Sequence, residues 1–190
     1  FMPFGIVTLL LLMLIVWKRH LAPFLTPVYA LCKGVILGSI SLAAETQFPG
    51  IVWHAAILTV AVLFVMLVAW RMQWIRATHR FRVTVLSITG AIFVVYLINF
   101  VLSFFGIRVP FLHDATPIGI GISLFTATMA ALNLVLDFDF IERTVRAKKS
   151  PKYLEWYAAF GFLITLIWLY VEILRLLQKF GRRGALFGGR

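Results

Sequence analysis

Six long apolar segments dominate this chain of 190 residues and limit what it can fold into. Each is close to the ~20 residues that a helix needs to cross ~30 Å of hydrocarbon. With 62% hydrophobic residues, the chain lies above the ~45–50% typical of soluble domains. The sequence therefore predicts an all-α integral membrane protein in contact with the lipid bilayer, a single bundle domain over residues 1–190. The predicted transmembrane helices cover residues 1–17, 24–44, 50–70, 83–105, 116–141 and 153–177.

The connecting loops divide by charge into two sides. Loops at 18–20, 71–82 and 142–152 follow the first, third and fifth segments and hold eleven of the 18 Lys and Arg residues. The loops of the opposite side, at 45–50 and 106–115, contain one cation, Arg108. The excess of Lys and Arg in cytoplasmic loops predicts that the basic side faces the cytoplasm, and we expect a bacterial cytoplasmic membrane.

The C-terminal tail, residues 178–190, is basic and is expected to be flexible. With six spans it would lie on the less basic side, although it carries Lys179, Arg182, Arg183 and Arg190. Two explanations remain open: the earlier loops outweigh these charges, or the last segment is re-entrant.

Several functional classes have no support in the sequence. A net charge of +11 could suggest nucleic-acid binding, but the cations lie in short loops between apolar segments, so no nucleic-acid partner is expected. Cys32 is the only cysteine, and the four histidines show no ligand spacing, so neither a disulfide, a metal site nor another cofactor is expected. No catalytic motif is present, and we expect no enzyme.

The fifth segment combines a small and polar helix face with two acidic residues near its end. Steps of four and three residues back from Asp137 give a polar seam of Asn133, Ala130, Thr126, Ser123, Gly119 and Thr116. This spacing places them on one helical face that packs against other helices. One interpretation is tight packing alone. We favour a polar path that also serves function, because packing does not require the ionisable Asp137.

Each charged residue near this face has an expected partner. Asp139 precedes Arg143 by four residues, which favours an ion pair on the helix surface. A buried Asp137 needs a counter-group on another helix, and depth favours Lys33, then Glu155 through a shared proton, then Arg19. Glu172 lies ~26 Å from Glu155 along a straight helix. We therefore expect it to pair with Arg175 or Arg108.

The stretches that carry these residues resemble a known family. "PIGIGISLFTATMAALNLVLDFDFIE", "PKYLEWYAAFG" and "WLYVEILRLL" are similar to the transmembrane Bax-inhibitor family, in its bacterial YccA-like branch. "TPVYALCKGVILGSIS" and "FGIRVPFLHDATPIGIG" fit the same pattern, so the resemblance covers nearly the whole chain. It implies seven helices with the last one central, and hence one helix before Phe1.

The resemblance also implies a function for these charges. Some members are pH-sensitive calcium leaks gated by a carboxylate pair on the last two helices. The first acid corresponds to Asp137, the second to Glu155 or Glu172, and an arginine that pairs with the first acid corresponds to Arg19. Lys33 departs from the pattern, because an ammonium beside Asp137 would neutralise the charge that a cation path needs.

Two functions follow as hypotheses. The first is a cation leak, with Ca²⁺ as the transported ion, whose gate and ion path involve Asp137, Glu155, Glu172 and Asp139. The alternative is a non-transporting membrane partner: a regulator or substrate of a membrane protease, or a subunit of a larger membrane complex. Contact between Asp137 and a glutamate favours the leak, whereas contact with Lys33 favours the non-transporting partner.

Overall fold

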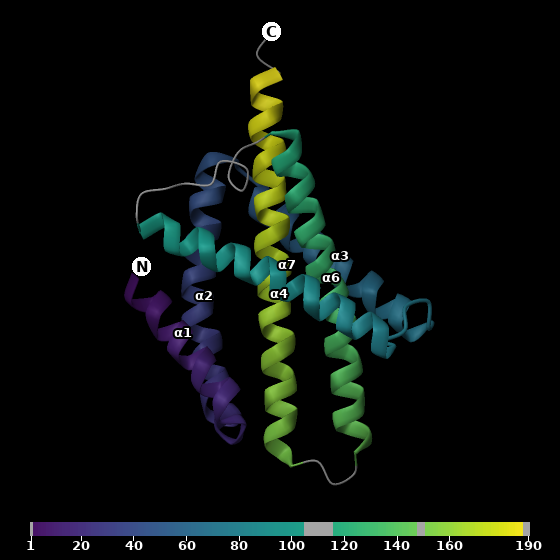
Figure 1. Ribbon diagram of the computed structural model, residues 1–190. Helices are drawn as coiled ribbons and strands as arrows, with labels where there is room; N and C mark the ends of the chain where they lie inside the picture. Colours follow the sequence, from purple (N-terminus) through teal and green to yellow (C-terminus); the bar gives the residue numbers. More distant parts are fainter. Residues whose placement is uncertain (1, 105–115, 148–150, 188–190) are drawn as a thin grey trace.

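The computed structural model describes residues 2–104, 116–147 and 151–187, and these parts are helical throughout apart from short turns. Figure 1 shows the arrangement of the helices. They are α1 (Met2–Trp17), a 3₁₀ turn η1 (Arg19–Leu21), α2 (Ala22–Gln47), α3 (Ile51–Arg71), α4 (His79–Phe104), α6 (Pro117–Arg146) and α7 (Lys152–Phe187).

The predicted segments agree with these helices, and the predicted breaks near 18–23, 45–50 and 71–82 are confirmed. The loop predicted at 106–115 lies outside the described residues. Five of the described helices are long and apolar enough to cross a membrane, whereas α1 is shorter. The seventh helix and the cytoplasmic position of the basic loops remain predictions.

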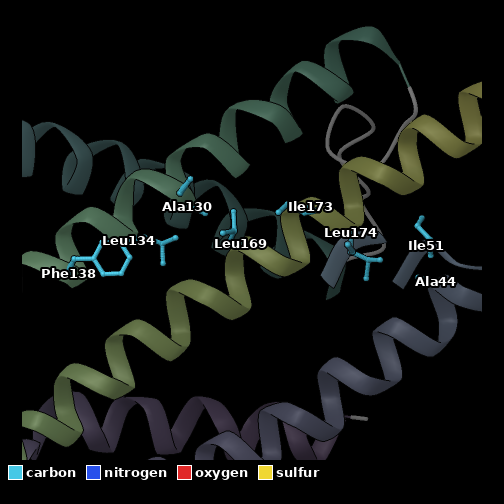
Figure 2. Packing of buried hydrophobic residues seen from close by; sticks show 10 residues of the cluster. Ala44, Ile51, Ala130, Leu134, Phe138, Leu169, Ile173 and Leu174 are labelled. Carbon is cyan, nitrogen blue, oxygen red and sulfur yellow. The ribbon is translucent and has the colours of Figure 1, made fainter. Parts of the chain in front are cut away.

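Helix α7 lies at the centre of the described helices (Figure 1). Its Leu169, Ile173 and Leu174 join the largest buried cluster, together with α3 and α6 (Figure 2). Its Phe160 packs against a second cluster formed by α1 and α2. Because α7 takes part in both, it connects the two sides of the bundle.

The last helix is longer than the segment predicted for it. Residues 178–187 continue α7 to Phe187, and the flexibility expected of the tail stays a prediction. The physical reason for the greater length is packing, because the Lys179 side chain is only 3% exposed and Gly181 lies against the ring of Phe48. At 1.5 Å per residue, the 36 residues of α7 span about 54 Å, well beyond the ~30 Å of hydrocarbon.

The contact at Gly181 gives a test of this extended helix. A β-carbon there would lie 2.9 Å from Phe48 Cε1, so Gly181→Ala forces the phenylalanine ring to move. We expect it to lower the free energy of unfolding by about 1–2 kcal/mol, as overpacking does. Unfolding by SDS titration in mixed micelles measures the change.

The matched control is Gly38→Ala on α2, where a β-carbon would meet nothing within 4 Å. That variant should be neutral or stabilised by up to ~1 kcal/mol, because alanine favours the helix. Equal effects of the two substitutions would contradict the packing of residues 178–187 on the bundle.

Candidate functional site

The polar seam predicted on α6 is buried between helices. Ser123, Thr126 and Asn133 are all buried, and each has a hydrogen-bonding partner on α4 or α7. Leu132 and Leu136, on either side of Asn133 in the sequence, pack against an apolar cluster with Val85 and Ile92 of α4. The seam therefore forms a line of polar contacts through an otherwise apolar bundle.

Glu172 of α7 is the most buried charged residue among those described, with 1% exposure. Its Oε2 accepts a hydrogen bond from Thr126 of the seam at 2.9 Å. Its Oε1 accepts from the Tyr96 hydroxyl at 2.7 Å and from Trp168 Nε1 at 3.2 Å. Arg175, which we predicted as a partner, forms the ion pair at 3.1 Å. Three helices thus meet at one carboxylate.

Arg175 is held in place by the same cluster. Its Nη1 also donates to the Tyr96 hydroxyl at 2.9 Å, and its Cζ lies 5.4 Å from the centroid of the Tyr96 ring. Such a position over an aromatic face is favourable for a cation. The Glu172 carboxylate is therefore neutralised by Arg175 and hydrogen-bonded on both oxygens.

Lys179 occupies the seam near the start of α6. Its Nζ donates to the Gly119 carbonyl and to the Ser123 hydroxyl, both at 2.8 Å. An ammonium with three donors requires such acceptors when it is buried. Lys179 and Arg175 both come from α7, so two basic side chains of the last helix reach this end of the seam.

Asp137 lies further along α6, at the other end of the seam. It is beside Thr165 of α7, and a β-carbon on Gly161 would be 3.7 Å from its Oδ1. Its Oδ2 is buried and has no hydrogen-bonding partner. Among the described residues, no Lys or Arg forms an ion pair with it. A carboxyl group in this setting is an exception that requires an explanation.

The predicted counter-groups of Asp137 lie elsewhere. Lys33 has its Nζ 5.9 Å from the centre of the Tyr29 ring, and Arg19 lies over Tyr157 at 5.2 Å. Glu155 is exposed on α7, at the margin of a cavity with Thr144. The structure does not bring Asp137 together with any of the three. Lys33 and Arg19 lie against aromatic rings instead, and Glu155 is exposed.

The predicted carboxylate pair is not formed either. Thr126, which contacts Glu172, precedes Asp137 by eleven residues, or about 16 Å along the helix. Asp137 and Glu172 are therefore two separate sites on the seam, one with a cationic partner and one without.

Asp139 makes the predicted ion pair with Arg143 and adds a second pair, with Arg82 of α4 at 3.0 Å. Between this contact and Tyr96, Asn133 donates to the Thr89 hydroxyl at 2.7 Å. The three α4 residues, Arg82, Thr89 and Tyr96, are spaced by seven, so they lie on one helical face. We missed these residues, although polar residues at intervals of seven in an apolar helix were a visible signal.

Metal binding has no further support in the described part of the chain, where no three His, Cys, Asp or Glu residues gather into a set that could hold an ion.

Comparison with known proteins gives one match. A family model described as "Bax inhibitor 1 like" matches residues 1–182. No curated protein and no solved structure matches the chain.

Proposed function

Because the chain belongs to the Bax inhibitor 1-like family, we propose that this membrane protein is a pH-sensitive cation leak with Ca²⁺ as the transported ion. We place it in a bacterial cytoplasmic membrane, in the YccA-like branch of the family. The proposal rests on Asp137, a carboxyl group within a transmembrane helix that lacks a cationic partner. Ionisable residues in such positions are costly and typically mark ion or proton pathways.

The proposed gate uses one carboxyl group in place of a pair. An ionised Asp137 needs a cation or water beside it, whereas a protonated Asp137 is neutral and compatible with apolar surroundings. Glu172 does not take this role, because Arg175 already neutralises it. Protonation of Asp137 removes the charge that attracts a cation, so acidification closes the path.

Calcium flux in proteoliposomes, measured against pH, tests this mechanism. We expect the wild-type flux to fall as the pH is lowered. Asp137→Asn should reduce flux at neutral pH roughly tenfold, equivalent to 1.4 kcal/mol of lost cation attraction, and should abolish the pH dependence. The readout is the initial rate of dye response inside the vesicles.

The matched control is Asp139→Asn, which removes a carboxylate two residues away whose partners are Arg82 and Arg143. It should retain the pH dependence of the wild type. If Asp137→Asn behaves like the wild type across the pH range, the single-carboxyl gate is refuted.

One observation favours the alternative function. The buried Glu172 carboxylate is paired with Arg175 and hydrogen-bonded to α4 and α6, so protein side chains fill this part of the seam. A non-transporting partner of a membrane protease or membrane complex would need no open path. Absence of flux at every pH, together with cleavage or stable capture by a membrane protease, would support that role.

A further inference from the structure

We infer that a crevice between α6 and α7 is a water-filled vestibule through which hydrated cations approach Asp137, with Glu155 at its mouth. This inference rests on the proposed function, since Asp137 is the group that the vestibule serves. It adds to the proposed gate the side from which cations enter and the residue that attracts them.

The crevice is a cavity of about 320 Å³ near the end of α6 and the beginning of α7. The two helices separate toward their connection in this region (Figure 1). Its walls are Ile141, Thr144 and Val145 of α6 and Glu155, Ala158, Ala159 and Phe162 of α7, five apolar residues and two polar ones. The volume is enough for several water molecules at ~30 Å³ each.

The cavity is aligned with Asp137. Residues 137, 141 and 144 follow one another at intervals of four and three, so they share a face of α6. On α7, Gly161 lies beside the Asp137 carboxyl group, and the next residue, Phe162, lines the cavity. The inner end of the cavity is thus about one helical turn from Asp137, with Ile141 and Phe162 in between.

The position of the cavity favours water over lipid chains. The α6 residues that line it alternate with Glu142, Arg143 and Arg146, which form ion pairs on the helix surface. Charged pairs of this kind belong to the polar boundary of the membrane, where water is available. A path from this boundary would give the buried Oδ2 of Asp137 a hydrogen-bond donor.

Glu155 gives the mouth of the vestibule a negative charge. Its side chain is exposed at the margin of the cavity, so it attracts cations and repels anions. Among the described residues that line the cavity, Glu155 is the one that carries a charge, and a charge at a cleft raises the local concentration of the opposite ion. Ile141 and Phe162 line the cavity on the side of Asp137, and apolar residues in such a position can control ion passage by excluding water.

Thiol labelling tests the vestibule without any measurement of transport. In a Cys32→Ser background, single cysteines replace Ala159 in the cavity wall, Gly161 beside Asp137, and Leu67 on α3. Leu67 is the control for a position on the lipid-facing side of the bundle, because its side chain is 41% exposed. It lies one turn from Trp70, which packs against Phe138, so its depth is close to that of Asp137. Charged, membrane-impermeant methanethiosulfonates are supplied on both sides of reconstituted vesicles.

We expect Ala159→Cys to react readily, Gly161→Cys to react more slowly, and Leu67→Cys not to react. At Ala159→Cys the cationic reagent should be favoured over the anionic one. Glu155→Gln should reduce this preference by up to about thirtyfold, because one unit charge at 4 Å in water changes each of the two rates about fivefold in opposite directions. Phe162→Ala should accelerate labelling at Gly161→Cys. Thr165→Cys provides a second probe at the depth of Asp137 if Gly161→Cys does not fold.

Labelling of Gly161→Cys and Thr165→Cys no faster than of Leu67→Cys would overturn the vestibule, as would an unchanged reagent preference in Glu155→Gln. A cavity occupied by lipid chains would give the first of these results. Labelling as expected without calcium flux would retain the vestibule and reject the leak. Calcium flux without labelling would retain the leak and reject the vestibule.

Discussion

Replacement of Arg175 by methionine is expected to lower the free energy of unfolding by about 3 kcal/mol. This is the lower end of the cost of removing one partner of a buried ion pair, because Glu172 is buried whereas the Arg175 side chain is partly exposed. The substitution retains much of the side-chain volume but leaves the Glu172 carboxylate without its cation. Because Glu172 is 1% exposed, water cannot replace the lost partner. Unfolding by SDS titration in mixed micelles measures the effect.

Two further variants separate charge from packing. Glu172→Gln combined with Arg175→Met removes both charges and should recover a large part of the lost stability. Arg146→Met makes the same chemical change in an exposed pair with Glu142, where we expect a loss below about 1 kcal/mol. A loss in Arg175→Met no larger than that in Arg146→Met would contradict the buried pair described above.

Leu134→Ala should destabilise the bundle by about 2–5 kcal/mol, as large-to-small substitutions in packed cores do. Leu134 of α6 has 0% exposure and belongs to the cluster shared with α3 and α7, which includes Leu169 and Phe138 (Figure 2). Lipid chains are as apolar as leucine, so the loss arises from packing contacts between helices. The same SDS titration gives the measurement.

Leu67→Ala provides the comparison on the bundle exterior. Because that leucine is partly exposed on α3, its removal should cost less than that of Leu134, about 1 kcal/mol. Similar losses for the two leucines would mean that the α3, α6 and α7 cluster is not packed as described.

The part of the fold that depends on local sequence was predictable. Apolar length located the helices, and alternating steps of three and four found the buried face of α6 with Ser123, Thr126 and Asn133. The Asp139 to Arg143 and Glu172 to Arg175 pairs were also predictable, because each joins residues within one helical turn of the same helix.

Contacts between helices were not predictable in this way. Residue counting gave depths along each helix, but depth does not determine which helix turns toward which neighbour. Lys33 and Asp137 were matched by depth, yet the lysine lies over Tyr29 of its own helix. A cation was predicted beside Asp137 because a buried carboxylate without one is unfavourable. The structure instead places Thr165 and Gly161 of α7 beside it.

The polar residues at intervals of seven on α4 have a consequence for how the chain assembles. Arg82, Thr89 and Tyr96 meet Asp139, Asn133 and Glu172 in turn, and Val85 and Ile92 occupy the apolar positions between them. A slip of α4 by one turn would set valine and isoleucine against polar groups and leave three polar residues facing hydrocarbon. Apolar surfaces in lipid discriminate poorly between such alignments. These three polar contacts therefore determine how α4 aligns with α6 and α7, because only one alignment forms all of them.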